Sequence, residues 1–303
     1  MDLSDLRSST MLVTGGNTGI GLETAVGLAG TGARVVITSR SADRGARALD
    51  TIRTRSGSER VDVMPLDLGS FASIRTFAAA FLARYDRLDV LINNAGLAPA
   101  GHRRETAEGF EAAFGVNHLG HFLLTRLLLD RIVASAPARI VVVSSGAYRA
   151  APDGICFDDL QHKDDFHSFR VYGESKLANI YFMLELARQL AGTGVSVNAL
   201  NPGYVATELG KRRPEDGPAP GPRPAEPRTT GAARVLDNLP PPMPAAEGAR
   251  TSIQLATSPT FEGVTGAYFN EGVREPLDPI ARDADAAQRL WLESERLIAS
   301  YPA

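Results

Sequence analysis

The stretch Thr14-Gly15-Gly16-Asn17-Thr18-Gly19-Ile20-Gly21 follows directly on an apolar run and opens a segment of helical periodicity. Glycine at such a junction permits a tight turn, lets the backbone approach a pyrophosphate, and lets the helix pack closely on the strand. The first turn of the helix then presents unpaired N–H groups and a positive dipole end to an anion. The order strand, glycines, helix predicts a nucleotide-binding turn rather than an ordinary glycine turn.

Outward from this turn, short apolar runs alternate with longer segments of helical periodicity, which is the pattern of βαβ units in a parallel sheet. The runs are rich in Val, Ile and Leu, as expected for strands covered on both faces. We predict one α/β domain over residues 1–303, with a doubly wound, mainly parallel, seven-stranded sheet of the Rossmann type flanked by helices. The predicted strands are 10–14, 34–38, 61–66, 88–92, 139–143, 195–200 and 266–269, and the helices are 19–30, 42–54, 70–85, 105–134, 168–191, 245–257 and 285–299.

One segment departs from this alternation. Residues 211–228 hold six prolines and two glycines among mixed charges, a composition that cannot build a core. We expect an irregular Pro-rich insertion over residues 208–244, and its place after the sixth strand favours a lid over the substrate pocket against a merely solvated loop. Beyond it we expect a C-terminal docking helix over residues 283–299. Its docking residues are Leu290, Trp291, Leu297 and Ile298.

Composition excludes several classes of function. The 32 basic side chains nearly balance the 35 acidic ones, which favours neither nucleic acid nor an anionic membrane as a partner. The single cysteine, Cys156, excludes an internal disulfide framework and fits a reducing compartment, where it is a small core or loop residue. The first ten residues show no secretory signal, and charges interrupt the richest apolar stretch, 122–133. We therefore expect a cytoplasmic protein with no membrane anchor.

A tyrosine and a lysine four residues apart, Tyr172 and Lys176, share one face of a predicted helix. A nearby ammonium favours phenolate, so it should lower the phenol pKa and allow proton exchange near neutral pH. Ser145 follows the fifth predicted strand and could stabilise charge developing on a substrate oxygen. Such a pair occurs by chance on many helices, so its meaning depends on the rest of the chain.

The rest of the chain resembles the short-chain dehydrogenase/reductase family. Three residues separate Gly15 from Gly19 and one separates Gly19 from Gly21, which is similar to the family's glycine motif. Asn-Asn-Ala-Gly at 93–96 looks like its NNAG element. The resemblance covers almost the whole chain and is closest to the retinol dehydrogenase-like branch. It is carried by Val-Asn-His-Leu-Gly-His-Phe (116–122), Ser-Lys-Leu-Ala-Asn (175–179) and Asn-Pro-Gly-Tyr-Val-Ala-Thr-Glu-Leu (201–209).

The resemblance implies a catalytic set of Asn117, Ser145, Tyr172 and Lys176, in which Asn117 holds a water that links Lys176 to solvent. Ser145 is preferred to Ser144 because the second of the family's paired serines is normally catalytic. The NNAG element would brace the sheet, Asp67 would contact adenine, and the segment from Pro202 onward would embrace the nicotinamide and pyrophosphate. The residues expected to bind the cofactor are Gly15, Asn17, Thr18, Gly19, Ile20, Gly21, Arg40, Asp67, Leu68, Asn94, Ala95, Gly96, Tyr172, Lys176, Pro202, Gly203, Val205 and Thr207.

The end of the second strand bears on the choice of nicotinamide. NAD enzymes of this fold usually place Asp or Glu there, where it accepts hydrogen bonds from the adenosine ribose. This chain has Ile-Thr-Ser-Arg at 37–40 instead. Arg40 is placed to clamp a 2′-phosphate through charge-assisted contacts, and Arg44, a turn later, either assists it or faces water. We therefore expect NADP(H) to be preferred to NAD(H), the alternative being that Arg40 is a solvated loop cation.

The expected function is an NADP(H)-dependent oxidoreductase that transfers a hydride between nicotinamide and a lipophilic ketone or aldehyde, or the corresponding alcohol. The alternatives are an NAD-dependent alcohol dehydrogenase and, from another class, a non-catalytic dinucleotide-sensing regulatory protein. His118 and His121 could share a helix face, but no third ligand has metal spacing, so no metal is expected. Retinoid specificity is not implied, because the insertion after Leu209 looks unlike that of the animal members. The resemblance is compatible with a homodimer or homotetramer.

Overall fold

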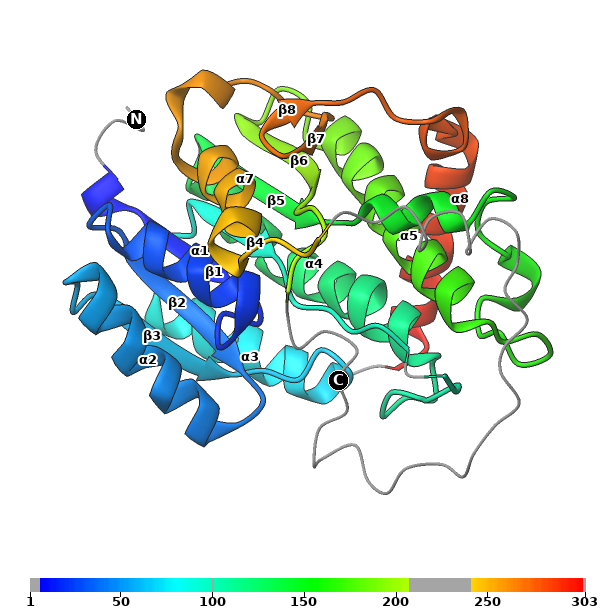
Figure 1. The fold of residues 1–303 in the computed structure, drawn as a ribbon, viewed down its shortest axis with the longest axis horizontal. Coiled ribbons are helices and arrows are strands. Elements are labelled where there is room, and N and C mark those ends of the chain that lie inside the picture. The colour runs from blue at the N-terminus through cyan, green and yellow to red at the C-terminus, as the bar shows by residue number, and fades with distance from the viewer. Residues whose placement is uncertain (1–5, 100, 207–240, 302–303) are drawn as a thin grey trace.

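The computed structural model describes residues 6–99, 101–206 and 241–301. Its centre is a single sheet with the strand order β3-β2-β1-β4-β5-β6-β7-β8 (Figure 1). Strands β1 to β7 pair in parallel, and β8 pairs antiparallel with β7. The predicted doubly wound, mainly parallel α/β fold is therefore confirmed. The strands are β1 (Thr10–Val13), β2 (Arg34–Ser39), β3 (Val61–Pro65), β4 (Val90–Asn93), β5 (Ala138–Val143), β6 (Val195–Asn201), β7 (Tyr268–Asn270) and β8 (Val273–Arg274).

The sheet has one strand more than the seven predicted. Strand β8 is joined to β7 by Glu271 and Gly272, whose φ angles are 49° and 83°, as in a tight two-residue hairpin. Both residues of β8 are exposed, and a two-residue strand is too short to show alternation of apolar and polar side chains. The sequence therefore offers no pattern from which β8 could have been predicted.

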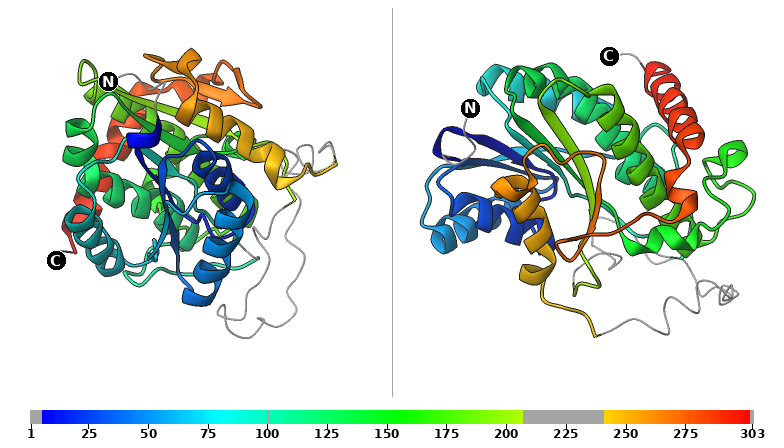
Figure 2. Two further views of the ribbon diagram at one scale, coloured as in Figure 1. Left: turned by 90° about the vertical axis from the view of Figure 1, so that its left-hand side faces the viewer. Right: turned by 90° about the horizontal axis from the view of Figure 1, so that it is seen from above.

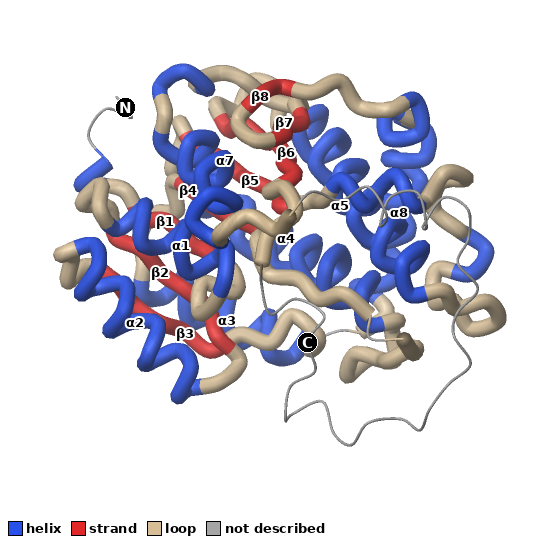
Figure 3. Tube along the Cα trace, in the orientation of Figure 1, coloured by secondary structure: helices blue, strands red, loops and turns tan. Residues whose placement is uncertain are grey.

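Helices cover both faces of the sheet (Figures 2 and 3). On one face α1, α2 and α7 share a core with strand residues such as Val13 and Val35. On the other, α3, α4 and α5 share a core with the alternate strand residues, such as Leu12 and Val36. The helices are α1 (Gly19–Ala29), α2 (Ala42–Ser56), α3 (Phe71–Arg84), the π-helix η2 (Phe114–Leu119), α4 (Gly120–Ala134), α5 (Ser168–Gln189), α7 (Ala245–Thr257) and α8 (Ala284–Ala299), with short 3-10 helices at η1 (Leu6–Ser8), η3 (Gly146–Ala150), η4 (Phe157–Asp159), η6 (Pro259–Phe261) and η7 (Pro279–Arg282).

The helix predicted over 105–134 begins later than expected. Glu105 and Glu111 form an antiparallel bridge, and the turn between them has Gly109 at a φ of 83°. The Thr106 side chain accepts a hydrogen bond from the Phe110 N–H at 3.2 Å, a local bond that competes with helix formation. The helical stretch starts at residue 112 and passes through η2 before α4. The prediction was therefore wrong for residues 105–111.

Helix α8 packs along α5 and closes one side of the molecule. Its N-terminus is capped by Asp283, whose carboxylate accepts a hydrogen bond from the Ala286 N–H at 2.9 Å. Trp291 is buried and stacks on Phe182, with ring centroids 6.0 Å apart. Among the helices of the described ranges, none combines the length and hydrophobicity that crossing a bilayer requires. Of the expected insertion at 208–244, residues up to 240 lie outside the described part of the chain.

Candidate active site

A cavity of about 780 Å³ opens at the carboxyl ends of the parallel strands. This is where open α/β sheets bind their ligands, and the volume suits a large organic molecule. The structure brings the predicted site residues of the β1–α1 turn, the strand ends and α5 together around this cavity, from Gly15 to Val205. Asn117 lies behind the lining, and Thr207 lies outside the described residues.

The glycine turn can be built only from glycine at its critical positions. Gly15 has a φ of 64°, and a Cβ there would lie 3.0 Å from the Ala95 Cβ. A Cβ on Gly21 would lie 2.4 Å from the Gly15 carbonyl oxygen. The Asn94 side-chain amide donates a hydrogen bond to the Thr14 carbonyl at 2.8 Å and so ties the turn to the end of β4. A backbone cradle this bare of side chains fits a pyrophosphate.

The end of β2 lines the part of the cavity beyond the glycine turn. Thr38, Ser39, Arg40 and Arg44 all face it. The Thr38 hydroxyl accepts a hydrogen bond from the Gly15 N–H at 3.1 Å, which fixes this end of the strand to the turn. No acidic residue occupies positions 37–42. The end of β2 therefore presents cations and hydroxyls, and no carboxylate, to the cavity.

Tyr172 and Lys176 project from one face of α5 into the cavity. The Lys176 ammonium lies 5.7 Å from the centre of the Tyr172 ring and donates to the Val143 carbonyl at 3.2 Å. Burial raises the pKa of Tyr172 to about 12, although a hydrogen bond with Ser145 opposes this rise. Burial also lowers the pKa of Lys176 to about 8. The expected lowering of the phenol pKa was therefore wrong for this structure, because desolvation outweighs an ammonium bonded elsewhere.

The two neighbouring serines have different partners. The Ser145 hydroxyl lies close enough to the Tyr172 phenol to act on its pKa, and it accepts from the Ala147 N–H at 3.1 Å, which caps the short helix η3. The Ser144 hydroxyl instead donates to the Lys176 carbonyl at 2.7 Å and is buried. Ser144 therefore fastens α5 to the end of β5, while Ser145 presents its hydroxyl beside the phenol.

Asn117 lies in the π-helix η2 and is fully buried. Its side-chain oxygen accepts from the Leu97 N–H at 2.8 Å, and its amide donates to the Leu97 carbonyl at 3.0 Å and to the Ser175 hydroxyl at 2.9 Å. Gly96 separates it from Lys176: a Cβ on Gly96 would lie 3.3 Å from the Asn117 Oδ1 and 3.5 Å from the Lys176 Nζ. The contacts of Asn117 therefore hold the loop after β4 against α5.

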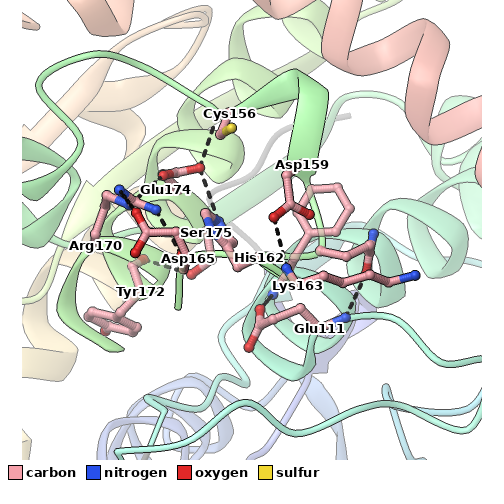
Figure 4. A network of polar contacts seen from close by, with 12 residues as sticks. Glu111, Cys156, Asp159, His162, Lys163, Asp165, Arg170, Tyr172, Glu174 and Ser175 are labelled. Atoms are coloured by element: carbon pink, nitrogen blue, oxygen red, sulfur yellow. Dashed lines mark hydrogen bonds and ion pairs between the residues drawn. The ribbon is translucent and has the colours of Figure 1, made fainter. Parts of the chain in front are cut away.

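The opposite face of α5 carries a buried polar network (Figure 4). The Glu174 carboxylate lies 3.2 Å from the His162 Nε2 and 3.5 Å from the Arg170 Nε, and it accepts from the Cys156 N–H at 3.0 Å. Burial alone would lower the pKa of His162, but the hydrogen bond and charge of Glu174 outweigh it and raise that pKa. Cys156 itself is an exposed loop residue.

This network escaped prediction because His162 and Glu174 belong to no motif and meet only in the folded chain. The same holds for Glu111, which lines the cavity with a buried carboxyl whose pKa is raised by burial. Its backbone N–H donates to the Gln161 side chain at 2.7 Å. Such loop residues leave no periodic signal in a sequence.

The two histidines that were considered as metal ligands, His118 and His121, contact side-chain hydroxyl groups. The His118 Nε2 lies 2.7 Å from the Ser294 hydroxyl, and the His121 Nε2 lies 2.9 Å from the Thr14 hydroxyl. Within the described ranges, no three His, Cys, Asp or Glu side chains are grouped so that they could hold a metal ion.

A glycine turn at the end of β1, a Ser-Tyr-Lys cluster beside it and a shared cavity define a dinucleotide-dependent oxidoreductase. The sequence matches the short chain dehydrogenase family over residues 9–157 and 160–217, and the chain belongs to the short-chain dehydrogenase/reductase family. It is 42% identical to retinol dehydrogenase 14 of Homo sapiens over 97% of this chain and 87% of that protein. It is 43% identical to dehydrogenase/reductase SDR family member 13 of Bos taurus over 99% of this chain and 76% of that protein.

A solved structure, the Pseudomonas aeruginosa RhlG/NADP active-site complex, matches with a TM-score of 0.64 at 25% identity, covering 88% of this chain and 96% of that one. The predicted resemblance to the retinol dehydrogenase-like branch is confirmed by these relatives. The protein is an oxidoreductase that acts on CH–OH or C=O groups of small molecules with a nicotinamide dinucleotide.

Proposed function

We propose that this enzyme uses NADP(H) to reduce a lipophilic ketone or aldehyde and to oxidise the corresponding alcohol in reverse. The observation that carries the proposal is that Tyr172, Ser145 and Lys176 line the same cavity as the glycine turn and Arg40. That cavity can hold a dinucleotide and bring a carbonyl group to a proton donor.

The bound dinucleotide supplies the hydride that reduces the carbonyl carbon. Ser145 donates a hydrogen bond to the carbonyl oxygen and stabilises the charge that develops there. Tyr172, kept protonated because burial raises its pKa to about 12, gives its proton to that oxygen. The Lys176 ammonium stabilises the resulting phenolate. Asn117 completes the catalytic set by holding α5 through Ser175.

The cofactor is held by the turn and strand ends in this proposal. The residues that line the cavity and would hold the dinucleotide are Gly15, Asn17, Thr18, Gly19, Ile20 and Gly21 at the pyrophosphate, Asp67 and Leu68 toward the adenine, Asn94, Ala95 and Gly96 beside the cofactor, and Pro202, Gly203 and Val205 at the nicotinamide and pyrophosphate. Arg40 and Arg44 favour NADP(H), because they can bind a 2′-phosphate and no carboxylate ends β2.

The substitution Arg40→Asp tests this preference. It removes one cation and supplies the carboxylate that the ribose of NAD(H) prefers. We expect the ratio of the Kd values for NADPH and NADH to shift toward NADH by about 30-fold, as for loss of a charge-assisted hydrogen bond. Calorimetric titration measures both constants, and Arg47→Asp, on the exposed side of α2, is the matched control. An unchanged ratio in Arg40→Asp would favour the NAD-dependent alcohol dehydrogenase.

The substrate end of the cavity supports a lipophilic substrate. Its lining includes Leu97, Ala98, Pro99, Ala112 and Phe169, and relatives of this chain are named for retinol, a lipophilic alcohol. Oxidation of NADPH with a panel of aldehydes and ketones separates the enzyme from a dinucleotide sensor, which would bind NADPH without consuming it. Cytoplasmic location and assembly as a homodimer or homotetramer stay predictions of the sequence.

A further inference from the structure

Two buried histidines in one helical stretch contact different parts of the molecule. His118, in η2, places its Nε2 2.7 Å from the Ser294 hydroxyl of α8. His121, at the start of α4, places its Nε2 2.9 Å from the Thr14 hydroxyl and its Nδ1 3.0 Å from the Asn117 carbonyl oxygen. His118 therefore joins η2 to α8, whereas His121 joins the glycine turn to η2.

The partners of His121 fix where its ring carries a proton. A carbonyl oxygen can only accept, so Nδ1 is protonated and Nε2 is left as an acceptor. The Thr14 hydroxyl then donates to Nε2, since that 2.9 Å contact is shorter than its 3.3 Å contact with the Ile92 carbonyl. Burial lowers the pKa of His121 to about 4, so the ring stays neutral at neutral pH.

The Thr14 hydroxyl donates one hydrogen bond and accepts two, which is the most that a hydroxyl can make. Besides donating to His121, it accepts from the Asn94 N–H at 2.9 Å and from the Ala95 N–H at 3.0 Å. Asn94, Ala95 and the adjoining Gly15 all line the cavity. Without the imidazole, the hydroxyl that aligns the ends of β1 and β4 would lose its shorter acceptor contact and keep only the 3.3 Å contact with the Ile92 carbonyl.

Hydrogen bonds to the backbone and the side chain of Asn117 link His121 to helix α5. The carbonyl of Asn117 accepts from His121, and the side-chain amide of Asn117 donates to the Ser175 hydroxyl at 2.9 Å. Ser175 in turn donates to the backbone carbonyl of Tyr172 at 2.7 Å. The ring of His121 thus lies in the middle of a path from the dinucleotide cradle to the backbone of the proton donor.

We infer that His121 is a positioning residue, which fixes the turn after β1 relative to the helix that carries Tyr172. It lies behind the residues that line the described cavity, so it acts through Thr14 and Asn117 and not by touching the dinucleotide. The inference rests on the proposed function, because it assigns to His121 an effect on dinucleotide binding and turnover together.

The test compares His121→Phe with His118→Phe. Each substitution exchanges a buried neutral imidazole for an apolar ring in the same helical stretch, so each is expected to lower the Tm. In calorimetric titration we expect the Kd for NADPH to rise about tenfold in His121→Phe, as for one lost buried hydrogen bond, and to change by less than about twofold in His118→Phe. We expect kcat to fall in His121→Phe alone, and His121→Gln, which keeps a donor and an acceptor, to recover part of both losses.

A double-mutant cycle with Thr14→Val separates positioning from a general loss of stability. If His121 acts through the Thr14 hydroxyl, Thr14→Val combined with His121→Phe binds NADPH about as weakly as either single variant, whereas Thr14→Val and His118→Phe have additive effects. An additive His121 cycle, or a wild-type Kd in folded His121→Phe, would overturn the inference. Should His121→Phe not fold, an unchanged Kd in Thr14→Val would overturn it. Wild-type protein that binds no NADPH would instead contradict the proposed function.

Discussion

The two faces of helix α5 are built on opposite electrostatic principles. On the cavity face, Lys176 is buried, and its ammonium has a carbonyl oxygen as its hydrogen-bond acceptor, with no ion pair to it among the described residues. On the opposite face, the buried Glu174 is compensated by His162 and Arg170 (Figure 4). A buried charge without a counter-ion costs stability, whereas a paired one is tolerated. We therefore expect the residues on the cavity face to serve catalysis and those on the other face to hold the helix in place.

This contrast shows how one helix serves two purposes. An ammonium whose pKa burial lowers to about 8 can respond to a phenolate forming beside it. A carboxylate that already has three partners cannot respond in this way, but it fastens the loop holding Cys156 and His162 to α5. We therefore expect substitutions on the cavity face to affect catalysis, and those on the opposite face to affect stability.

The largest effect is expected for Lys176→Met. Loss of the ammonium removes the charge that stabilises the Tyr172 phenolate, so kcat/KM should fall by about 10³-fold. The same substitution removes a buried charge, so the free energy of unfolding should rise by about 1 kcal/mol. Steady-state kinetics and urea denaturation measure the two quantities. A lower free energy of unfolding with an unchanged kcat/KM would show that Lys176 stabilises the fold and does not serve catalysis.

A smaller effect, on stability, is expected for Glu174→Leu. This change leaves the His162 ring and the Cys156 N–H without their buried acceptor, so the free energy of unfolding should fall by about 3 kcal/mol. Glu185→Leu is the matched control on the same helix. Glu185 pairs with the exposed Arg188, so its loss should cost less than about 1 kcal/mol. If urea denaturation gives the same decrease in unfolding free energy for both variants, the network at Glu174 stabilises the protein no more than the ion pair at Glu185.

The smallest expected effect is a dependence of the free energy of unfolding on pH, caused by His162. The pKa of His162 is raised above its ordinary value of 6.5, with Glu174, Glu111 and Arg170 as the charges that act on it. Its contribution is present in full below pH 6.5 and is lost as the pH rises through the raised pKa. The free energy of unfolding should therefore fall between pH 6.5 and that pKa in the wild type, and fall less in His162→Gln. If urea denaturation gives the same dependence of the unfolding free energy on pH for the wild type and His162→Gln, His162 does not contribute to it.

The parts of the fold that the sequence predicts are those fixed by local chemistry. Strand ends and the glycine turn were predictable because Gly15 and Gly21 admit no side chain and the apolar runs are continuous. The start of η2 was not, because the Thr106 side chain and Gly109 favour a turn within a stretch of helical periodicity. Strand β8 was not, because two exposed residues carry no pattern.

For the site, the sequence predicts which residues gather but not how their energies balance. The motif positions Tyr172 and Lys176 do share one cavity. The predicted lowering of the Tyr172 pKa was wrong. The direction of this shift depends on how deeply the fold buries the phenol and on the Val143 carbonyl, which accepts the hydrogen bond of Lys176. Contacts from loops, such as Glu111 and His162, form only in the folded chain and could not be predicted from spacing.

The most direct test of the account is NADPH oxidation by Tyr172→Phe with an aldehyde that the wild type reduces. The variant keeps the ring and loses only the hydroxyl that is the proposed proton donor. We expect the rate in a single turnover to fall by about 10³-fold, as for loss of a general acid, while the Kd for NADPH from calorimetry changes by less than about threefold, because the other cofactor-binding residues are kept. A variant that binds NADPH normally and still reduces the aldehyde at the wild-type rate would contradict the assignment of Tyr172 as the proton donor.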